Sequence, residues 1–154
     1  MTFSWKRYAV AIFIVVFALD TWTKFWAMDF LHVQGIYIGS WIGIDLFLNL
    51  TTNQGAAWGV GASIPTVLFV LRVLVIVGLI VYLFSKRCPQ NYRIPLCFAL
   101  SGAISNVRDT LVWGHVIDMI DVRLWGYDFP VFNVADMAIS LSVLVLFLRV
   151  RNAV

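Results

Sequence analysis

Two aspartates in the last third of the chain stand where a carboxylate is costly. Asp118 lies inside the apolar run 116–120, and Asp136 follows Asn133 at the start of another apolar segment. They are 18 residues apart, too far to be neighbours on one helix, but a loop that folds back between two helices would bring them together. Two carboxylates at close range cannot both ionise easily, so one keeps its proton. Such a pair supplies an acid and a base at one pH, as aspartic proteases require.

Each aspartate also has an ordinary structural explanation. Pro130 interrupts the chain and Asn133 is a good N-cap. Asp136 would then be the third residue of a helix, where the helix dipole favours a carboxylate. Asp118 would be a surface loop acid, although its apolar neighbours are a poor choice for a solvated loop. The residues alone leave both explanations open.

The composition places these acids in a polytopic membrane protein. Apolar residues make up 62% of the 154-residue chain and charged residues 12%, with a mean hydropathy of +0.90. Soluble domains are roughly 45–50% apolar. A basic start and an apolar run also describe a signal peptide, but Asp20 and Lys24 end the run without a small-residue cleavage site, so we expect an uncleaved first span. The sequence predicts one domain, residues 1–154, with four transmembrane helices at about 8–26, 64–84, 94–113 and 132–148.

A small β-sheet is predicted between the first two spans, on the membrane surface. Residues 27–63 contain no part long and apolar enough to cross a membrane. Alternate residues from 42 to 50 are apolar, a pattern typical of a strand with one apolar face. We therefore expect a membrane α-helical fold with an extracytoplasmic β-platform at about residues 30–60. The apolar members of the pattern are Ile42, Ile44, Leu46, Leu48 and Leu50.

The distribution of charge predicts the orientation. Seven of the eleven basic residues lie at the termini or in the loop between the second and third spans, which share one side if there are four spans. Basic loops are retained in the cytoplasm, so both termini are expected there. All eight acidic residues fall toward the opposite, outer face, where any chemistry would lie. No basic stripe suggests nucleic-acid binding, and Cys88 and Cys97 have no metal-site spacing, so we expect no metal and no cofactor.

Polar residues near the other span ends need an explanation, since an ionisable residue in a span marks a functional site by default. Asp20 and Lys24 are four residues apart and can pair on one helix face, either as a plain salt bridge or to position a site. Asn53 and Gly55 follow the predicted strand, either as a turn or as an amide that binds a peptide or orients a carboxylate. Arg72 is interpreted as a snorkelling or partnered structural charge.

The third span carries a further polar group. Asn106 and Asp109 share one face of the predicted helix, and Arg108 could neutralise an acid nearby. Gly102 and Ser105 suit close contact between helices. The stretch alone does not separate a structural polar cluster from part of a site.

Taken together, these motifs resemble the lipoprotein signal peptidase (signal peptidase II) family. Each is weak alone, but five in order on a four-span frame are specific. The motifs are Asp20-x-x-x-Lys24, Asn53-x-Gly55-Ala-Ala57, Gly102-Ala-x-x-Asn106-x-x-Asp109, Gly114-x-Val-Ile-Asp118 and Phe129-Pro-x-Phe-Asn133-x-Ala-Asp136.

The resemblance implies an aspartic endopeptidase of the bacterial inner membrane, active without a metal. It would cleave the signal peptide of a prolipoprotein just before a diacylglyceryl-modified cysteine, on the outer face and as a monomer in membrane lipid. By position, Asp118 and Asp136 would be the catalytic pair. The residues expected to support the site or the substrate are Asp20, Lys24, Asn53, Gly55, Asn106, Arg108, Asp109 and Asn133.

One departure from the family pattern concerns the third span. The family usually reads Gly-Asn-x-x-Asp-Arg, whereas this chain has Thr110 after Asp109. Arg108 lies two residues before the expected arginine, rotated by about 200° around an α-helix. Either Arg108 serves in its place or that charge is lost.

Two rival functions remain at this point. A catalytically inactive relative would hold lipidated peptides without cutting them, which the missing arginine makes conceivable. A transporter or proton-relay protein would also use intramembrane acids, but it predicts acids near mid-span and often an inverted repeat. Here the acids lie at outer span ends and no repeat is visible.

Overall fold

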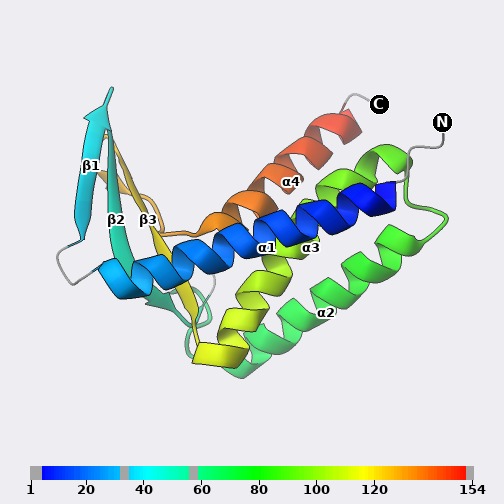
Figure 1. Cartoon of the computed structure of the whole chain (residues 1–154), viewed down its shortest axis with the longest axis horizontal. Helices are drawn as coiled ribbons and strands as arrows, with labels where there is room; N and C mark the ends of the chain where they lie inside the picture. Colours follow the sequence, from blue (N-terminus) through cyan, green and yellow to red (C-terminus); the bar gives the residue numbers. More distant parts are fainter. Residues whose placement is uncertain (1–4, 32–34, 56–58, 152–154) are drawn as a thin grey trace.

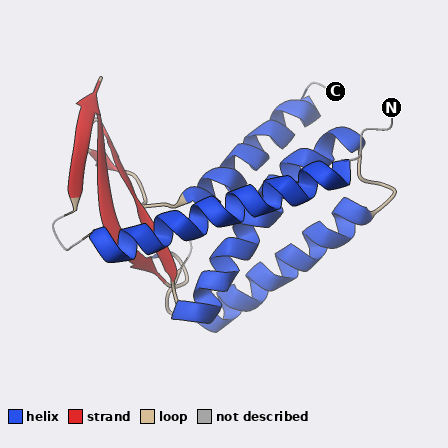
Figure 2. Cartoon of the chain, viewed as in Figure 1, coloured by secondary structure: helices blue, strands red, loops and turns tan. Residues whose placement is uncertain are grey.

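The computed structural model describes residues 5–31, 35–55 and 59–151. Four helices lie side by side, and a twisted sheet stands across one end of the bundle (Figures 1 and 2). The start of α1 and the end of α4 lie at the opposite end, with the α2–α3 loop (Figure 1). In order, the elements are α1 (Trp5–Phe30), β1 (Ile36–Trp41), β2 (Ile44–Asn53), α2 (Pro65–Phe84), α3 (Gln90–Trp113), β3 (Val116–Leu124), β4 (Tyr127–Asp128) and α4 (Val134–Arg151).

The predicted fold class, four helices with a small antiparallel sheet, is confirmed. Within the described residues, α1 and α2 are each long and apolar enough to cross a membrane. Most large apolar side chains of α2 face outward, including Leu71, Leu74 and Val75, each at least half exposed. Apolar side chains can face outward in this way where lipid surrounds the helix. By contrast, α3 carries the polar residues of the bundle interior on its buried face.

The sheet is larger than the sequence predicted. Its order is β1-β2-β3-β4 with antiparallel neighbours, so half of it comes from residues after α3. Asp118 was expected in a loop or at a fold-back between helices. It lies instead on β3, where it pairs with Thr51 of β2. The alternation predicted from Ile42 also needs correction, because Ile42 has a φ of 52° and is 92% exposed in the turn between β1 and β2.

Burial on both faces explains why β3 was not recognised. Val116, Ile117, Asp118 and Met119 are all buried, so apart from Asp118 this end of the strand is apolar on both faces and lacks a two-residue alternation. Ile117 and Met119 pack in one cluster with Ala27 and Leu31 at the end of α1, and this contact fixes the sheet on the bundle.

Close contact between α3 and α4 depends on Gly102. A Cβ at this position would meet the carbonyl oxygen of Ala135 and the side chain of Ile139. Both helices can therefore approach here only because Gly102 has no side chain. The contact places the first turn of α4 beside Gly102, at one end of the polar face of α3.

We predict that Gly102→Ala destabilises the protein by about 1–3 kcal/mol, because a methyl group would force α3 and α4 apart. Gly78→Ala is the matched control, since Gly78 also lies inside a helix but has no atom within 4 Å of its missing Cβ. That change should stabilise the protein by about 0.5–1 kcal/mol. Thermal unfolding of the two variants in detergent tests the comparison, and equal midpoints would contradict it.

Candidate active site

Backbone pairing between β3 and the segment before α4 brings the two aspartates together. Helix α3 ends at Gly114, whose φ of 77° allows the chain to turn into β3. The chain then returns beside β3, where Ile120 and Phe132 exchange backbone hydrogen bonds of 2.8 and 3.0 Å. Asp118 is two residues before Ile120 in the strand, and Asn133 directly follows Phe132, so both lie at this junction.

Asn133 caps the start of α4 as the sequence predicted, and Asp136 completes a capping box. Asn133 is the N-cap, and its Oδ1 accepts a 2.9 Å hydrogen bond from the backbone N–H of Asp136. In return, Oδ2 of Asp136 accepts one of 3.3 Å from the backbone N–H of Asn133. The carboxylate of Asp136 thus lies on the N-terminal turn of a helix, where the partial positive charge stabilises its ionised form.

The amide of Asn133 also connects the two aspartates. Its Nδ2 donates to Oδ1 of Asp118 over 2.7 Å and lies 3.1 Å from Oδ1 of Asn106. Asn106 in turn donates from Nδ2 to Oδ1 of Asp136 over 2.8 Å. Asn133 is fully buried, so this amide bridge is shielded from water.

Asp118 is itself almost fully buried, with 2% of its surface exposed. Burial and the neighbouring Asp136 carboxylate raise the pKa of Asp118 to about 6, although hydrogen bonds from Asn53 and Asn133 oppose the shift. The Asn53 side chain has both of the roles that the sequence left open. It contacts Asp118, and its Oδ1 accepts the N–H of Gly55 over 2.8 Å to form a turn. The Ala56–Trp58 part of this motif lies outside the described residues.

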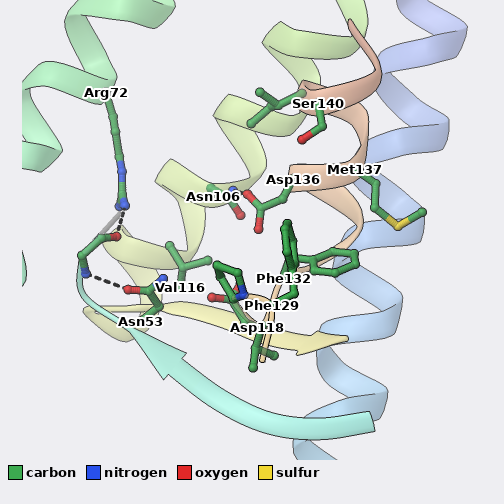
Figure 3. A pocket seen from close by; sticks show the side chains of 14 residues that line it. Asn53, Arg72, Asn106, Val116, Asp118, Phe129, Phe132, Asp136, Met137 and Ser140 are labelled. Carbon is green, nitrogen blue, oxygen red and sulfur yellow. Dashed lines mark hydrogen bonds between the residues drawn. The ribbon is translucent and has the colours of Figure 1, made fainter. Parts of the chain in front are cut away.

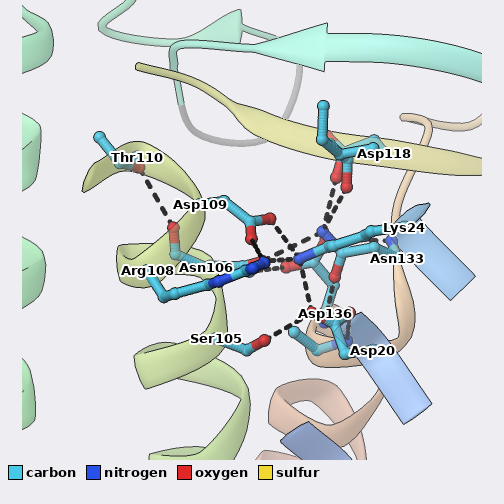
Figure 4. A network of polar contacts seen from close by, with 12 residues as sticks. Asp20, Lys24, Ser105, Asn106, Arg108, Asp109, Thr110, Asp118, Asn133 and Asp136 are labelled. Carbon is cyan, nitrogen blue, oxygen red and sulfur yellow. Dashed lines mark hydrogen bonds and ion pairs between the residues drawn. The ribbon is translucent and has the colours of Figure 1, made fainter. Parts of the chain in front are cut away.

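Lys24 is the centre of the polar network inside the bundle (Figure 4). Its Nζ lies 2.6 Å from Asp20, 2.5 Å from Asp109 and 3.0 Å from Oδ1 of Asn106. All three charged side chains are fully buried. The salt bridge expected within the first span is therefore present, and it extends across to the third span and, through Asn106, to Asp136.

Asp20 ties the network to the start of α4. Its Oδ1 accepts the backbone N–H of Ala135 over 2.8 Å, and its Oδ2 accepts the hydroxyl of Ser105 over 2.6 Å. These contacts could not be predicted from the sequence, because Asp20 and Ala135 are 115 residues apart. Asp20 thus caps a helix other than its own and holds that helix beside α3.

Arg108 makes the contact with an acid that was considered for it, and it also packs on two aromatic rings. Its guanidinium lies over the Trp113 ring at 4.5 Å and the Phe25 ring at 5.6 Å, with Asp109 at 3.3 Å. The closer cation for Asp109 is Lys24. The guanidinium that reaches Thr110 belongs instead to Arg72 of α2, with 3.4 Å from Nη1 to Oγ1.

Asp118 and Asp136 face one cavity of about 460 Å³ between the sheet and the bundle (Figure 3). Its remaining wall is largely apolar, with Val116, Phe129 and Phe132 among the lining residues. Two carboxyl groups at the wall of an apolar cavity can exchange protons with a polar group bound in it. Within the described residues, no three His, Cys, Asp or Glu side chains are placed to hold a metal ion.

Comparison with known proteins identifies the family. The family model described as signal peptidase (SPase) II matches residues 12–151. The chain belongs to the signal peptidase II family. This is a family of aspartic peptidases, so the fold and enzyme class predicted from the motifs are confirmed.

Individual relatives agree with the family match. The lipoprotein signal peptidases of Staphylococcus aureus strains JH9 and Newman are each 33% identical over 141 residues, covering 89% of this chain and 82% of the relative. Two solved structures described as a bacterial membrane enzyme, determined by the in meso method at 2.3 and 1.9 Å resolution, are each 26% identical. Their TM-scores are 0.81 and 0.77, covering 94% and 92% of this chain and 87% and 91% of theirs.

Removal of the central cation should be severely destabilising for this member of the signal peptidase II family. Lys24→Met leaves Asp20 and Asp109 buried without a counter-charge, which we expect to cost about 3–5 kcal/mol. Adding Asp109→Asn to Lys24→Met should recover part of the loss. Asp128→Asn is the control, because its ion pair with Arg123 is exposed and worth at most about 1 kcal/mol. Thermal unfolding in detergent measures all three, and a Lys24→Met midpoint equal to the control's would contradict the prediction.

Proposed function

We propose that this peptidase removes the signal peptide of a diacylglyceryl-modified prolipoprotein by cleaving just before the lipidated cysteine. The lipoprotein signal peptidases to which the chain is similar support this substrate class. The observation that carries the proposal is the pair of carboxyl groups at the wall of the apolar cavity, both bonded by Asn133. Its side-chain amide donates to Asp118, and its backbone N–H donates to Asp136. A lipid-modified peptide in extended form suits such a cavity, because its reacting amide would face the polar wall.

The proposed mechanism is general acid–base hydrolysis by Asp118 and Asp136. Asp136, ionised, takes a proton from a water molecule whose oxygen bonds to the scissile carbonyl carbon. Asp118, protonated, donates its proton to the carbonyl oxygen. Collapse of the tetrahedral intermediate breaks the C–N bond. The amine nitrogen takes up a proton from Asp136 as it leaves, and the carbonyl oxygen returns its proton to Asp118.

The environments of the two acids support this division of roles. Asp136 accepts hydrogen bonds on both oxygens and lies at a helix N-terminus, which favours its carboxylate. Burial raises the pKa of Asp118, which favours its acid form. The supporting roles in this proposal follow the contacts: Asn106 and Asn133 orient the pair, and Lys24 with Asp20 and Asp109 holds Asn106.

We also propose the membrane arrangement expected from the sequence. The chain would lie in the bacterial inner membrane as a monomer with both termini in the cytoplasm. The start of α1, the end of α4 and the basic α2–α3 loop lie at one end of the bundle (Figure 1). Asp118 lies at the other end, on β3 of the sheet. The sheet would then rest on the outer membrane surface, and the substrate would enter from the outer leaflet.

Substitution of either aspartate should abolish cleavage. Asp118→Asn and Asp136→Asn each remove one proton-transfer group, and we expect a loss of at least about 100-fold in kcat. Asp121→Asn is the matched control. Asp121 lies on the same strand and accepts a hydrogen bond from Asn49 over 2.5 Å, but it does not line the cavity, so most activity should remain.

A gel mobility assay with a purified lipidated precursor measures this loss and separates the rival functions. Only a peptidase releases a shorter product, whereas an inactive relative would bind the precursor without shortening it. Normal processing by Asp118→Asn would exclude the proposed mechanism.

The pH dependence of cleavage should report the proton on Asp118. Below its pKa Asp118 is protonated and can donate; as the pH rises through about 6 it ionises, so kcat/KM of the free enzyme should fall. Asn53→Ala removes a hydrogen bond that lowers this pKa, and should therefore move the alkaline limb to higher pH. A limb that moves to lower pH in Asn53→Ala would assign the proton differently.

A further inference from the structure

Arg72 is a charged residue in an otherwise apolar helix. Within α2 it is the only Asp, Lys or Arg, and it lies in the eighth position from Pro65. Its guanidinium reaches out of α2 toward the cavity wall, where it takes a position near the end of β2 (Figure 3). Burial of an arginine in a membrane span is unfavourable, so such a residue marks a function unless an ion pair explains it.

No carboxylate explains this arginine within the described residues. Their ion pairs include Lys24, Arg108 and Arg123 but not Arg72. The contacts of Arg72 are instead neutral. Its Nη2 donates to the backbone oxygen of Gly55 over 2.6 Å, and its Nη1 lies 3.4 Å from the hydroxyl of Thr110. Arg72 thus holds a piece of main chain to the bundle rather than neutralising a buried acid.

The main chain that Arg72 holds leads directly to the reacting pair. Gly55 donates its N–H to Oδ1 of Asn53 over 2.8 Å, and the Asn53 side chain bonds Asp118. A path of three contacts therefore links the guanidinium to Asp118. Movement of Gly55 away from α2 would draw Asn53 with it and change the hydrogen bonding of Asp118.

The contact with Thr110 places the same guanidinium beside position 110 of α3. Position 110 is where this chain departs from the signal peptidase II pattern by lacking an arginine. Arg108 lies over the rings of Trp113 and Phe25 and pairs with Asp109 at 3.3 Å, and it does not line the cavity. Of the described residues that line the cavity, Arg72 carries the only positive charge.

We propose that Arg72 is a positioning residue for the reacting pair, and that its guanidinium supplies from α2 the charge that position 110 lacks. Arg72 fixes Gly55, Gly55 fixes the side chain of Asn53, and Asn53 keeps its hydrogen bond to the Asp118 carboxyl group. The inference rests on the proposed function, because it assigns Arg72 a part in the same cleavage.

The test compares the full chain with Arg72→Met, Arg72→Lys and the double variant Arg72→Met/Thr110→Arg in detergent, with the lipidated precursor as substrate. Arg72→Met should lower kcat/KM by about 10- to 100-fold, mainly through kcat, because a small misplacement of a reacting group is costly. Adding Thr110→Arg to Arg72→Met should raise kcat/KM at least about tenfold above that of Arg72→Met. Arg72→Lys should have a lower kcat/KM than the double variant, since an ammonium lacks the planar fork of donors.

Arg87→Met is the matched control. It removes the same charge just beyond the other end of α2, where Arg87 is exposed, and should leave kcat/KM unchanged. Thermal midpoints of all variants identify any that fail to fold. In that event the comparison passes to Arg72→Lys, which keeps the charge and should still show a lower kcat.

A second readout is independent of cleavage. Carboxyl NMR of isotope-labelled aspartate, with Asp118→Asn to assign the signal, follows the titration of Asp118 directly. Loss of Arg72 should raise the pKa of Asp118, as loss of Asn53 does, because both changes remove the hydrogen bond that Asn53 makes to its carboxylate.

The two proposals fail in different ways. If the unaltered chain does not shorten the precursor, the proposed function is wrong, and the Asp118 titration still decides the role of Arg72. If the unaltered chain cuts but Arg72→Met keeps both its kcat/KM and the Asp118 titration, the role of Arg72 is overturned. A loss of activity with an unchanged titration and no rescue by Thr110→Arg would also overturn it, because Arg72 would then be only structural.

Discussion

A single buried ammonium group holds the polar interior of this bundle together. Lys24 contacts Asp20, Asp109 and Asn106, which come from its own helix and from α3, and none of these charges reaches water. Isolated carboxylates at such depth would take up protons or draw in solvent. The geometry of everything joined to Asn106, including Asp136 and Asn133, follows from where this ammonium sits.

The network also settles how α4 begins. Three side chains act on its first turn: Asn133 and Asp136 cap each other, and Asp20 accepts the N–H of Ala135 from a different helix. Most helix ends are satisfied locally. Here the end of α4 is also bonded to α1 and lies against Gly102 of α3, so the first turn has little freedom to move relative to the bundle.

Features encoded by neighbouring residues could be predicted from the sequence, whereas features that depend on tertiary packing could not. The four helices follow from the lengths of apolar runs, and the cap at Asn133 from its spacing to Pro130 and Asp136. Strand β3 was missed because burial of both faces removes the alternation that marks a strand. The partners of Arg72 could not be predicted, because Gly55 and Thr110 lie 17 and 38 residues away along the chain and only tertiary packing makes them neighbours. The contact from Asp20 to Ala135 was invisible for the same reason.

The pairing of Ile120 with Phe132 holds both ends of the segment between them together. Between these two residues the end of β3 and β4 pair with each other around the exposed turn at Trp125, and the chain then returns to the backbone hydrogen bonds of Ile120. The number of residues between Asp118 and Asp136 is therefore not what sets their approach. Insertions or deletions at the hairpin tip would then change the shape of this end of the sheet, while the strand register kept the two carboxyl groups at an unaltered distance.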